Sequence, residues 1–201
     1  MPIVRLPQGS LRDEIRLPLY DTITLAAAES PVGVRRFFSN VQGKSRARTN
    51  LRQNNLLETA VSYRVQGMAL DAQNFYAANV KALPIIMENS SLRLRIGEKD
   101  YWEGPMTYVA GRVWQNAAAA TTVAATTIEH IVQHFGEAAV QPVMLAGKHV
   151  VDINPLQSFF CEWTLDPSDV TAGEITASTP AAGTSIKFQF SLKGLLRRPV
   201  Q

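Results

Sequence analysis

The residues with the clearest chemical potential are two histidines four positions apart. Residues 129–134 read EHIVQH, so His130 and His134 would share one face of a helix and could together hold a metal ion. In the zinc-protease motif a glutamate directly follows the first histidine and acts as the general base, whereas Glu129 precedes both. The third histidine, His149, falls in a different element. A half-exposed helix face is therefore favoured, and no metal or other cofactor is expected.

A second chemically active group is a run of cations within residues 31–52. This segment contains no acidic residue and carries six positive side chains, Arg35, Arg36, Lys44, Arg46, Arg48 and Arg52. Cations without a local counter-charge attract phosphate, either on a nucleic acid or on an anionic lipid. The alternative is a solvated arm, or one that pairs with acidic residues of a neighbouring subunit. The pattern predicts a contact segment and leaves these partners open.

Three aromatic residues surround the dipeptide Gly104-Pro105 and could bind a sugar ring. They are Tyr101, Trp102 and Tyr108. Aromatic rings present flat apolar faces, but they more often fill the edge of a sandwich core or a subunit contact. We favour that second interpretation over a carbohydrate platform.

The motifs of the common enzyme classes are absent from the sequence. There is no GxSxG nucleophile elbow, no phosphate-binding P-loop, no GxGxxG and no CxxC pair. The single cysteine, Cys161, falls in an alternating segment, which is typical of a small buried apolar residue. Nothing selects a pair of carboxylates for general acid–base work. We therefore expect no catalytic residues and no small-molecule substrate.

Alternating segments predict the strands that must position these residues. The clearest cover residues 159–165 and 186–192, where apolar side chains alternate with polar ones, as in strands with one buried face. Residues 61–66 alternate in the same way, and the phase slips at Gly67, which predicts a β-bulge. Further strands are expected over 21–25, 92–96 and 101–109, with one or two more within 143–153.

The remaining segments are expected to be helices or loops. Pro84 would fit the first turn of a short helix over 81–88, and residues 127–135 have helical spacing that ends before Gly136. Residues 31–52 and 167–184 are rich in glycine and polar residues, which favours loops. No alternation of strands with helices appears, so a parallel sheet is not expected. The pattern predicts an all-β sandwich, and a jelly roll suits this number of strands.

Composition limits the function further. Only 18% of the 201 residues are charged, against about 25% in typical soluble domains, which is compatible with a subunit that buries much of its surface against neighbours. The net charge of +3 is not that of a dedicated nucleic-acid binder. No signal peptide and no apolar stretch of about 20 residues is visible. We expect a protein made in a cytoplasm.

Three stretches together resemble the jelly-roll major capsid proteins of tailless icosahedral bacteriophages. They are SYRVQGMALDAQN at 62–74, LRLRIGEKDYWEGPM at 92–106 and IKFQFSLKGLLRRPV at 186–200. The resemblance covers about two-thirds of the chain, from about residue 58 onward, and residues 112–140 have no counterpart in it. It implies a single eight-stranded jelly roll over residues 56–201, preceded by an N-terminal arm and basic segment over 1–55, with one or two short helical insertions.

The same resemblance implies a function and a set of partners. The chain would be a major capsid subunit of a virion, made in the host cytoplasm, that assembles into trimers or pseudo-hexamers of an icosahedral shell with other capsid proteins. The basic segment would face the genome, an internal membrane or an adjacent capsomer. Alternatives are a minor capsid, vertex or tail-associated β protein, a carbohydrate-binding β-sandwich, and a cupin-type metal enzyme built on His130 and His134.

Overall fold

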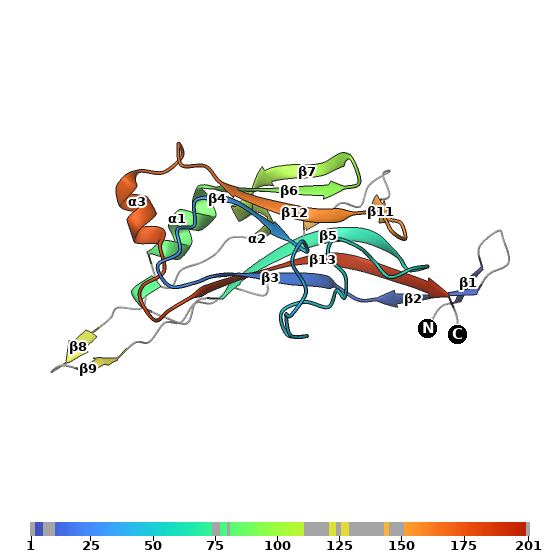
Figure 1. Cartoon of the computed structure of the whole chain (residues 1–201), viewed down its shortest axis with the longest axis horizontal. Helices are drawn as coiled ribbons and strands as arrows, with labels where there is room; N and C mark the ends of the chain where they lie inside the picture. Colours follow the sequence, from blue (N-terminus) through green and yellow to red (C-terminus); the bar gives the residue numbers. More distant parts are fainter. Residues whose placement is uncertain are drawn as a thin grey trace.

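The computed structural model describes the chain in eight stretches that together form two main β-sheets (Figure 1). The described residues are 3–5, 11–73, 77–79, 81–110, 121–123, 126–128, 143–144 and 151–199. All of the strand pairing that follows is antiparallel, and most of it links segments far apart in sequence.

Sheet A is built around one long strand, β13 (Ile186–Pro199). One edge of β13 pairs with β3 (Leu19–Leu25) along its first half and with β2 (Leu11–Arg16) along its second half. Its other edge pairs with β5 (Ser62–Gln73) along almost its whole length. Three short strands complete the sheet, β1 (Ile3–Arg5) on β2, and β10 (Val143–Met144) and β11 (Val151–Ile153) on β5.

Sheet B has four strands in the order β4-β12-β6-β7. They are β4 (Gly33–Phe37), β12 (Phe159–Leu165), β6 (Ser90–Ile96) and β7 (Lys99–Pro105). A separate hairpin consists of β8 (Thr121–Val123) and β9 (Thr126–Ile128). The helical elements are η1 (Ala77–Asn79), α1 (Ala82–Glu88), α2 (Met106–Ala110) and α3 (Ala172–Ser178), and α1 packs beside α3 at one end of the sheets.

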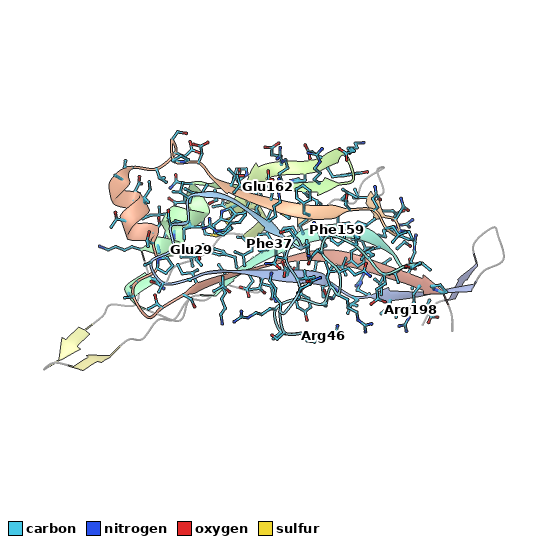
Figure 2. All side chains as sticks on the ribbon, in the orientation of Figure 1. Glu29, Phe37, Arg46, Phe159, Glu162 and Arg198 are labelled. Atoms are coloured by element: carbon cyan, nitrogen blue, oxygen red, sulfur yellow. The ribbon has the colours of Figure 1, made fainter. Side chains whose placement is uncertain are left out.

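The core lies between the two sheets and confirms the predicted alternation. Phe159, Cys161, Trp163 and Leu165 of β12 face Ile186, Phe188, Phe190 and Leu192 of β13, and all eight are at most 1% exposed. Trp163 and Phe188 lie with ring centroids 4.9 Å apart, and Phe37 lies 5.4 Å from Phe190. Figure 2 shows Phe37 and Phe159 in this layer. The chain is therefore an all-β sandwich of two antiparallel sheets, as the sequence predicts.

A bulge in β5 confirms the phase slip that the sequence shows at Gly67. Lys193 lies opposite Gly67 while Gly194 lies opposite Val65, so Gln66 is the extra residue in β5. The strand can therefore keep both Val65 and Met68 on its buried face. A Cβ at Gly194 would lie 2.0 Å from the Arg64 carbonyl oxygen, so the bulge requires a glycine on β13.

Three local predictions were wrong. Residues 106–110 form α2 rather than strand, because Pro105 ends β7 and the spacing of Met106, Val109 and Ala110 buries one helical face. The loop over 167–184 contains α3, which a capping box between Thr171 and Glu174 starts. The loop over 31–52 contains β4, whose alternation is hidden because only Phe37 at its end is fully buried.

Other predictions are confirmed or lie outside the described part. The strands over 21–25 and 92–96, one or two short strands within 143–153, and the helix over 81–88 are present as β3, β6, β10, β11 and α1. In the predicted helix over 127–135, Thr127 and Ile128 belong to β9, and 129–135 lie outside the described residues.

Residues 1–55, predicted as an arm and basic segment, supply β3 to sheet A and β4 to sheet B.

Candidate functional site

A pocket of about 380 Å³ collects four of the six predicted basic residues. It lies on the side of the sandwich where β3 ends sheet A and β4 ends sheet B. Its lining is formed by Thr22, Ile23, Thr24, Glu29, Arg35, Arg36, Asn40, Lys44 and Arg48. We call this site the basic pocket. The other two predicted residues, Arg46 and Arg52, do not line it.

Arg35 is held in place by the loop that precedes β4. Its guanidinium donates to the Glu29 carboxylate at 3.0 Å and to the carbonyl oxygens of Pro31 and Ser30, both at 2.6 Å. It also lies over the ring of Trp163, 5.3 Å from the centroid. The Arg35 side chain is only 18% exposed and is paired with Glu29, so it forms part of the pocket wall rather than an available positive charge.

Arg36 projects from the outer face of sheet B and has a buried partner. Its Nε donates to Glu162 of β12 at 2.8 Å, and its guanidinium stacks 4.7 Å from the ring centroid of Phe160. Arg93 of β6 donates to the other oxygen of the same carboxylate. Glu162 is therefore shared by cations on both neighbouring strands (Figure 2), and this network joins β4, β12 and β6.

Lys44 forms the most deeply buried ion pair among the described residues. Its ammonium lies 2.7 and 2.9 Å from the two oxygens of Asp21, whose side chain has no exposure to solvent. The same ammonium donates to the Thr22 carbonyl, and Asp21 also accepts the Phe38 backbone N–H at 2.7 Å. Lys44 therefore fastens the loop after β4 onto β3.

The last three cations lie on the surface of the loop after β4. Arg52 pairs with Glu58 at 3.2 Å, where both side chains are more than half exposed. Arg46 and Arg48 are exposed, and neither has an acidic partner within the described part of the chain. Figure 2 shows Arg46 on the loop that extends beyond sheet A.

Four of the six cations thus have an acidic partner in the same chain. The expectation of six uncompensated charges was wrong, because the partners Glu29, Glu162, Asp21 and Glu58 all lie outside residues 31–52. The strand pairing creates these contacts, and the local sequence cannot display them. Arg48 is the cation of the basic pocket that no described carboxylate neutralises.

Glu162 is the shared carboxylate of this network, and the sequence indicated only that it lies on the polar face of its strand. Burial raises the pKa of its carboxyl, but the hydrogen bonds and charges of Arg36 and Arg93 outweigh burial, so the pKa lies below its usual value. The cross-strand register could have indicated this, since Arg36, Glu162 and Arg93 lie side by side on adjacent strands.

We predict that Glu162→Gln lowers the free energy of unfolding by about 1–2 kcal/mol at neutral pH. The lowered pKa means that the ionised carboxylate contributes stability above its unfolded-state pKa and loses it as the pH falls through the folded-state value. Urea titrations at about pH 7 and about pH 3.5, one above and one below the ordinary pKa of a glutamate, should show a smaller difference between wild type and variant at the acid point. An equal difference at both values would contradict the prediction.

The predicted histidine site lies outside the described part of the chain, whereas Cys161 lies within it. His130, His134 and Glu129 lie outside the described residues, as does His149. Among the residues that the structure describes, no group of three or more metal-ligating side chains occurs. Cys161 is fully buried, and burial raises the pKa of its thiol well above the usual value, in agreement with a packing role.

The aromatic group does not form one exposed platform. Tyr101 and Trp102 are partly buried and pack against the core, while Tyr108 on α2 is 72% exposed. The rings therefore differ in setting, as expected for residues at the edge of a sandwich.

Within the described part of the chain, no helix has the length and apolar character needed to cross a membrane. Comparison with protein-family models, with curated proteins and with solved structures found no match.

Proposed function

We propose that the sandwich is a jelly roll. Eight strands support this, taken in chain order as β3, β4, β5, β6, β7, β11, β12 and β13. The first pairs with the last, β3 with β13, and the second with the seventh, β4 with β12. The third pairs with the sixth, β5 with β11, and the fourth with the fifth, β6 with β7. Such nested antiparallel pairs arise when one long hairpin is wrapped around a core.

The sheet orders agree with this topology. Alternate pairs of the wrapped hairpin fall in different sheets, β3-β13-β5-β11 in sheet A and β4-β12-β6-β7 in sheet B. The remaining strands β1, β2 and β10 extend sheet A, and β8 and β9 form their own hairpin. Jelly rolls occur in viral capsid proteins, lectins and cupins, so the topology alone leaves the function open.

We infer that the function is that of a major capsid subunit which assembles into an icosahedral shell. The observation that carries this is the filled interior of the nested sandwich. Its largest enclosed side chains include Phe37, Phe38, Phe159, Trp163 and Phe190, all without exposure to solvent. A jelly roll that binds a metal or a substrate inside needs an open interior with polar groups. A packed interior suits a protein that acts through its outer surface.

The sequence resemblance to tailless icosahedral phage capsid proteins supports the same proposal. It adds the partners, which are further copies of this chain in trimers or pseudo-hexamers together with other capsid proteins, and a place in the virion. Closed symmetry lets modest contacts between identical subunits build a stable shell. The basic pocket would then contact the genome, an internal membrane or a neighbouring subunit. A minor capsid, vertex or tail-associated role is the second candidate within this class.

The test is the assembly of the purified chain. We expect electron microscopy and sedimentation to show rings or shells of uniform size over a range of salt and pH. Monomers under every condition would contradict the capsid proposal. In particles purified from a natural source, a major subunit should dominate the protein mass, whereas a minor or vertex protein should not.

A carbohydrate-binding function makes the opposite prediction. It requires glycan binding that Trp102→Ala abolishes in a variant that still folds, which its melting temperature must show because Trp102 also packs against the core. A glycan array probed with wild type and with Trp102→Ala therefore separates the two functions.

A further inference from the structure

The two edges of sheet B differ in the charged side chains that they carry. The strand order β4-β12-β6-β7 places β4 at one edge and β7 at the other. The basic pocket adjoins β4, whereas β7 and the turn that leads into it carry three acidic side chains, Glu98, Asp100 and Glu103, and one cation, Lys99. We call this second group the acidic edge. Among the described strands, each of these two outer strands has a neighbour in the sheet on one side only.

The acidic edge offers carboxylates to solvent. Glu98 in the β6–β7 turn has a side chain that is 98% exposed, and Asp100 is 42% exposed. Arg95 lies 3.2 Å from Glu98 and 3.8 Å from Asp100, so it neutralises part of this charge. Glu103 is exposed opposite Arg93 in the strand register and interacts with its charge, but it forms no ion pair within the described part of the chain.

The basic pocket suits a small number of carboxylates better than a phosphate chain. Three of its four cations, Arg35, Arg36 and Lys44, already have a carboxylate partner. Arg48 is left without one among the described residues, and the side chain of Arg36 is still 52% exposed. A polyanion draws its affinity from many uncompensated cations, whereas one or two carboxylates can pair with Arg48 and the exposed part of Arg36 alone.

We propose that the basic pocket of one subunit receives the acidic edge of a second copy of this chain, with Glu103 close to Arg48. This inference rests on the proposed shell function and names the contact that would build it. Opposite charges on opposite edges favour a head-to-tail contact, which makes a ring when the rotation between copies closes. Like charges on both edges would instead repel neighbouring copies.

The proposal predicts a position-specific cross-link. Arg48→Cys and Glu103→Cys are made in separate full-length chains, then mixed and oxidised. The native Cys161 is fully buried, so it should not compete. The mixture should form a disulfide-linked dimer, and neither variant alone should do so. A chain with both substitutions should form a series of linked products that stops at the size of the ring.

The matched control moves the cysteine to another exposed cation. Lys193 is exposed on β13 of sheet A. Lys193→Cys removes one positive charge, as Arg48→Cys does, so its mixture with Glu103→Cys measures the disulfide yield from random collisions. We expect the Arg48→Cys mixture to give at least about tenfold more dimer than this control. Equal yields would overturn the proposed contact. Thermal unfolding of each variant shows whether the substitution has disturbed the fold.

A charge exchange provides a second measurement that needs no cysteine. Arg48→Glu or Glu103→Arg alone should weaken association, and a mixture of the two variants should associate more strongly than either alone. Association that is unchanged in both single variants would also overturn the contact.

The outcomes separate this inference from the proposed function. Particles together with the 48–103 cross-link support both. Particles without the cross-link overturn the contact and leave the shell function standing. A cross-link without particles supports the contact and counts against a shell. If the particles and the cross-link are both absent, the contact and the shell function are both overturned.

Discussion

Replacing Lys44 with methionine is expected to lower the free energy of unfolding by about 3–5 kcal/mol, because it leaves a buried carboxylate without its cation. Asp21 has no exposure to solvent, and both of its oxygens lie within 2.9 Å of the Lys44 ammonium. The remaining Phe38 N–H donates only one hydrogen bond to the carboxylate. Chemical denaturation at neutral pH measures the loss.

Two controls show whether the loss comes from the pair. Arg48→Met removes an exposed cation of the same pocket and should change stability by less than about 0.5 kcal/mol. Adding Asp21→Asn to Lys44→Met should recover part of the loss, since it removes the uncompensated charge. If Lys44→Met and Arg48→Met both changed the free energy of unfolding by the same small amount, the Lys44–Asp21 pair would not stabilise the fold.

Placing a methyl group at Gly194 is the second large effect that the structure predicts. The Cβ of Gly194→Ala would lie 2.0 Å from the Arg64 carbonyl oxygen and 2.9 Å from the Tyr63 ring. The nearest atom belongs to the backbone, so no side-chain rotation can relieve the overlap. We expect a loss of roughly 3 kcal/mol in unfolding free energy, or failure to fold, because overpacked sites must move the backbone.

Gly173 in α3 provides the matched control. A Cβ there meets nothing closer than the Thr171 hydroxyl oxygen at 3.9 Å. Gly173→Ala should be neutral or stabilise the protein by up to about 1 kcal/mol, since alanine favours helix more than glycine does. Similar melting temperatures for the two alanine variants would show that the β5–β13 bulge tolerates a side chain.

The fold could be predicted from the sequence where one face of a strand is buried. The alternation in β12 and β13 and the phase slip at Gly67 appear directly as buried residues and a bulge. β4 gave no such signal, since Phe37 is its only fully buried residue. α3 was missed because its capping box, Thr171 with Glu174, is a short polar motif within a polar segment.

The site was harder to predict, because its partners are distant in sequence. Arg36 and Glu162 are separated by 126 positions, and Arg93 and Glu162 by 69. The run of cations over 31–52 supplies four residues to the pocket lining, but its charge balance depends on strands that pair only in the folded chain. Lys44 and Arg48 were equivalent in the sequence, and burial beside Asp21 makes them different.

The long strand β13 also determines when sheet A can form. It is the central strand between β3 and β2 on one side and β5 on the other, and more than 100 residues separate it from each of them. The edges of β2, β3 and β5 that pair with β13 therefore stay unpaired until residues 186–199 have been synthesised. Contacts of such sequence separation make folding slow. A chain arrested before this point would expose unpaired strands, so chaperone binding should be strongest just before β13 emerges.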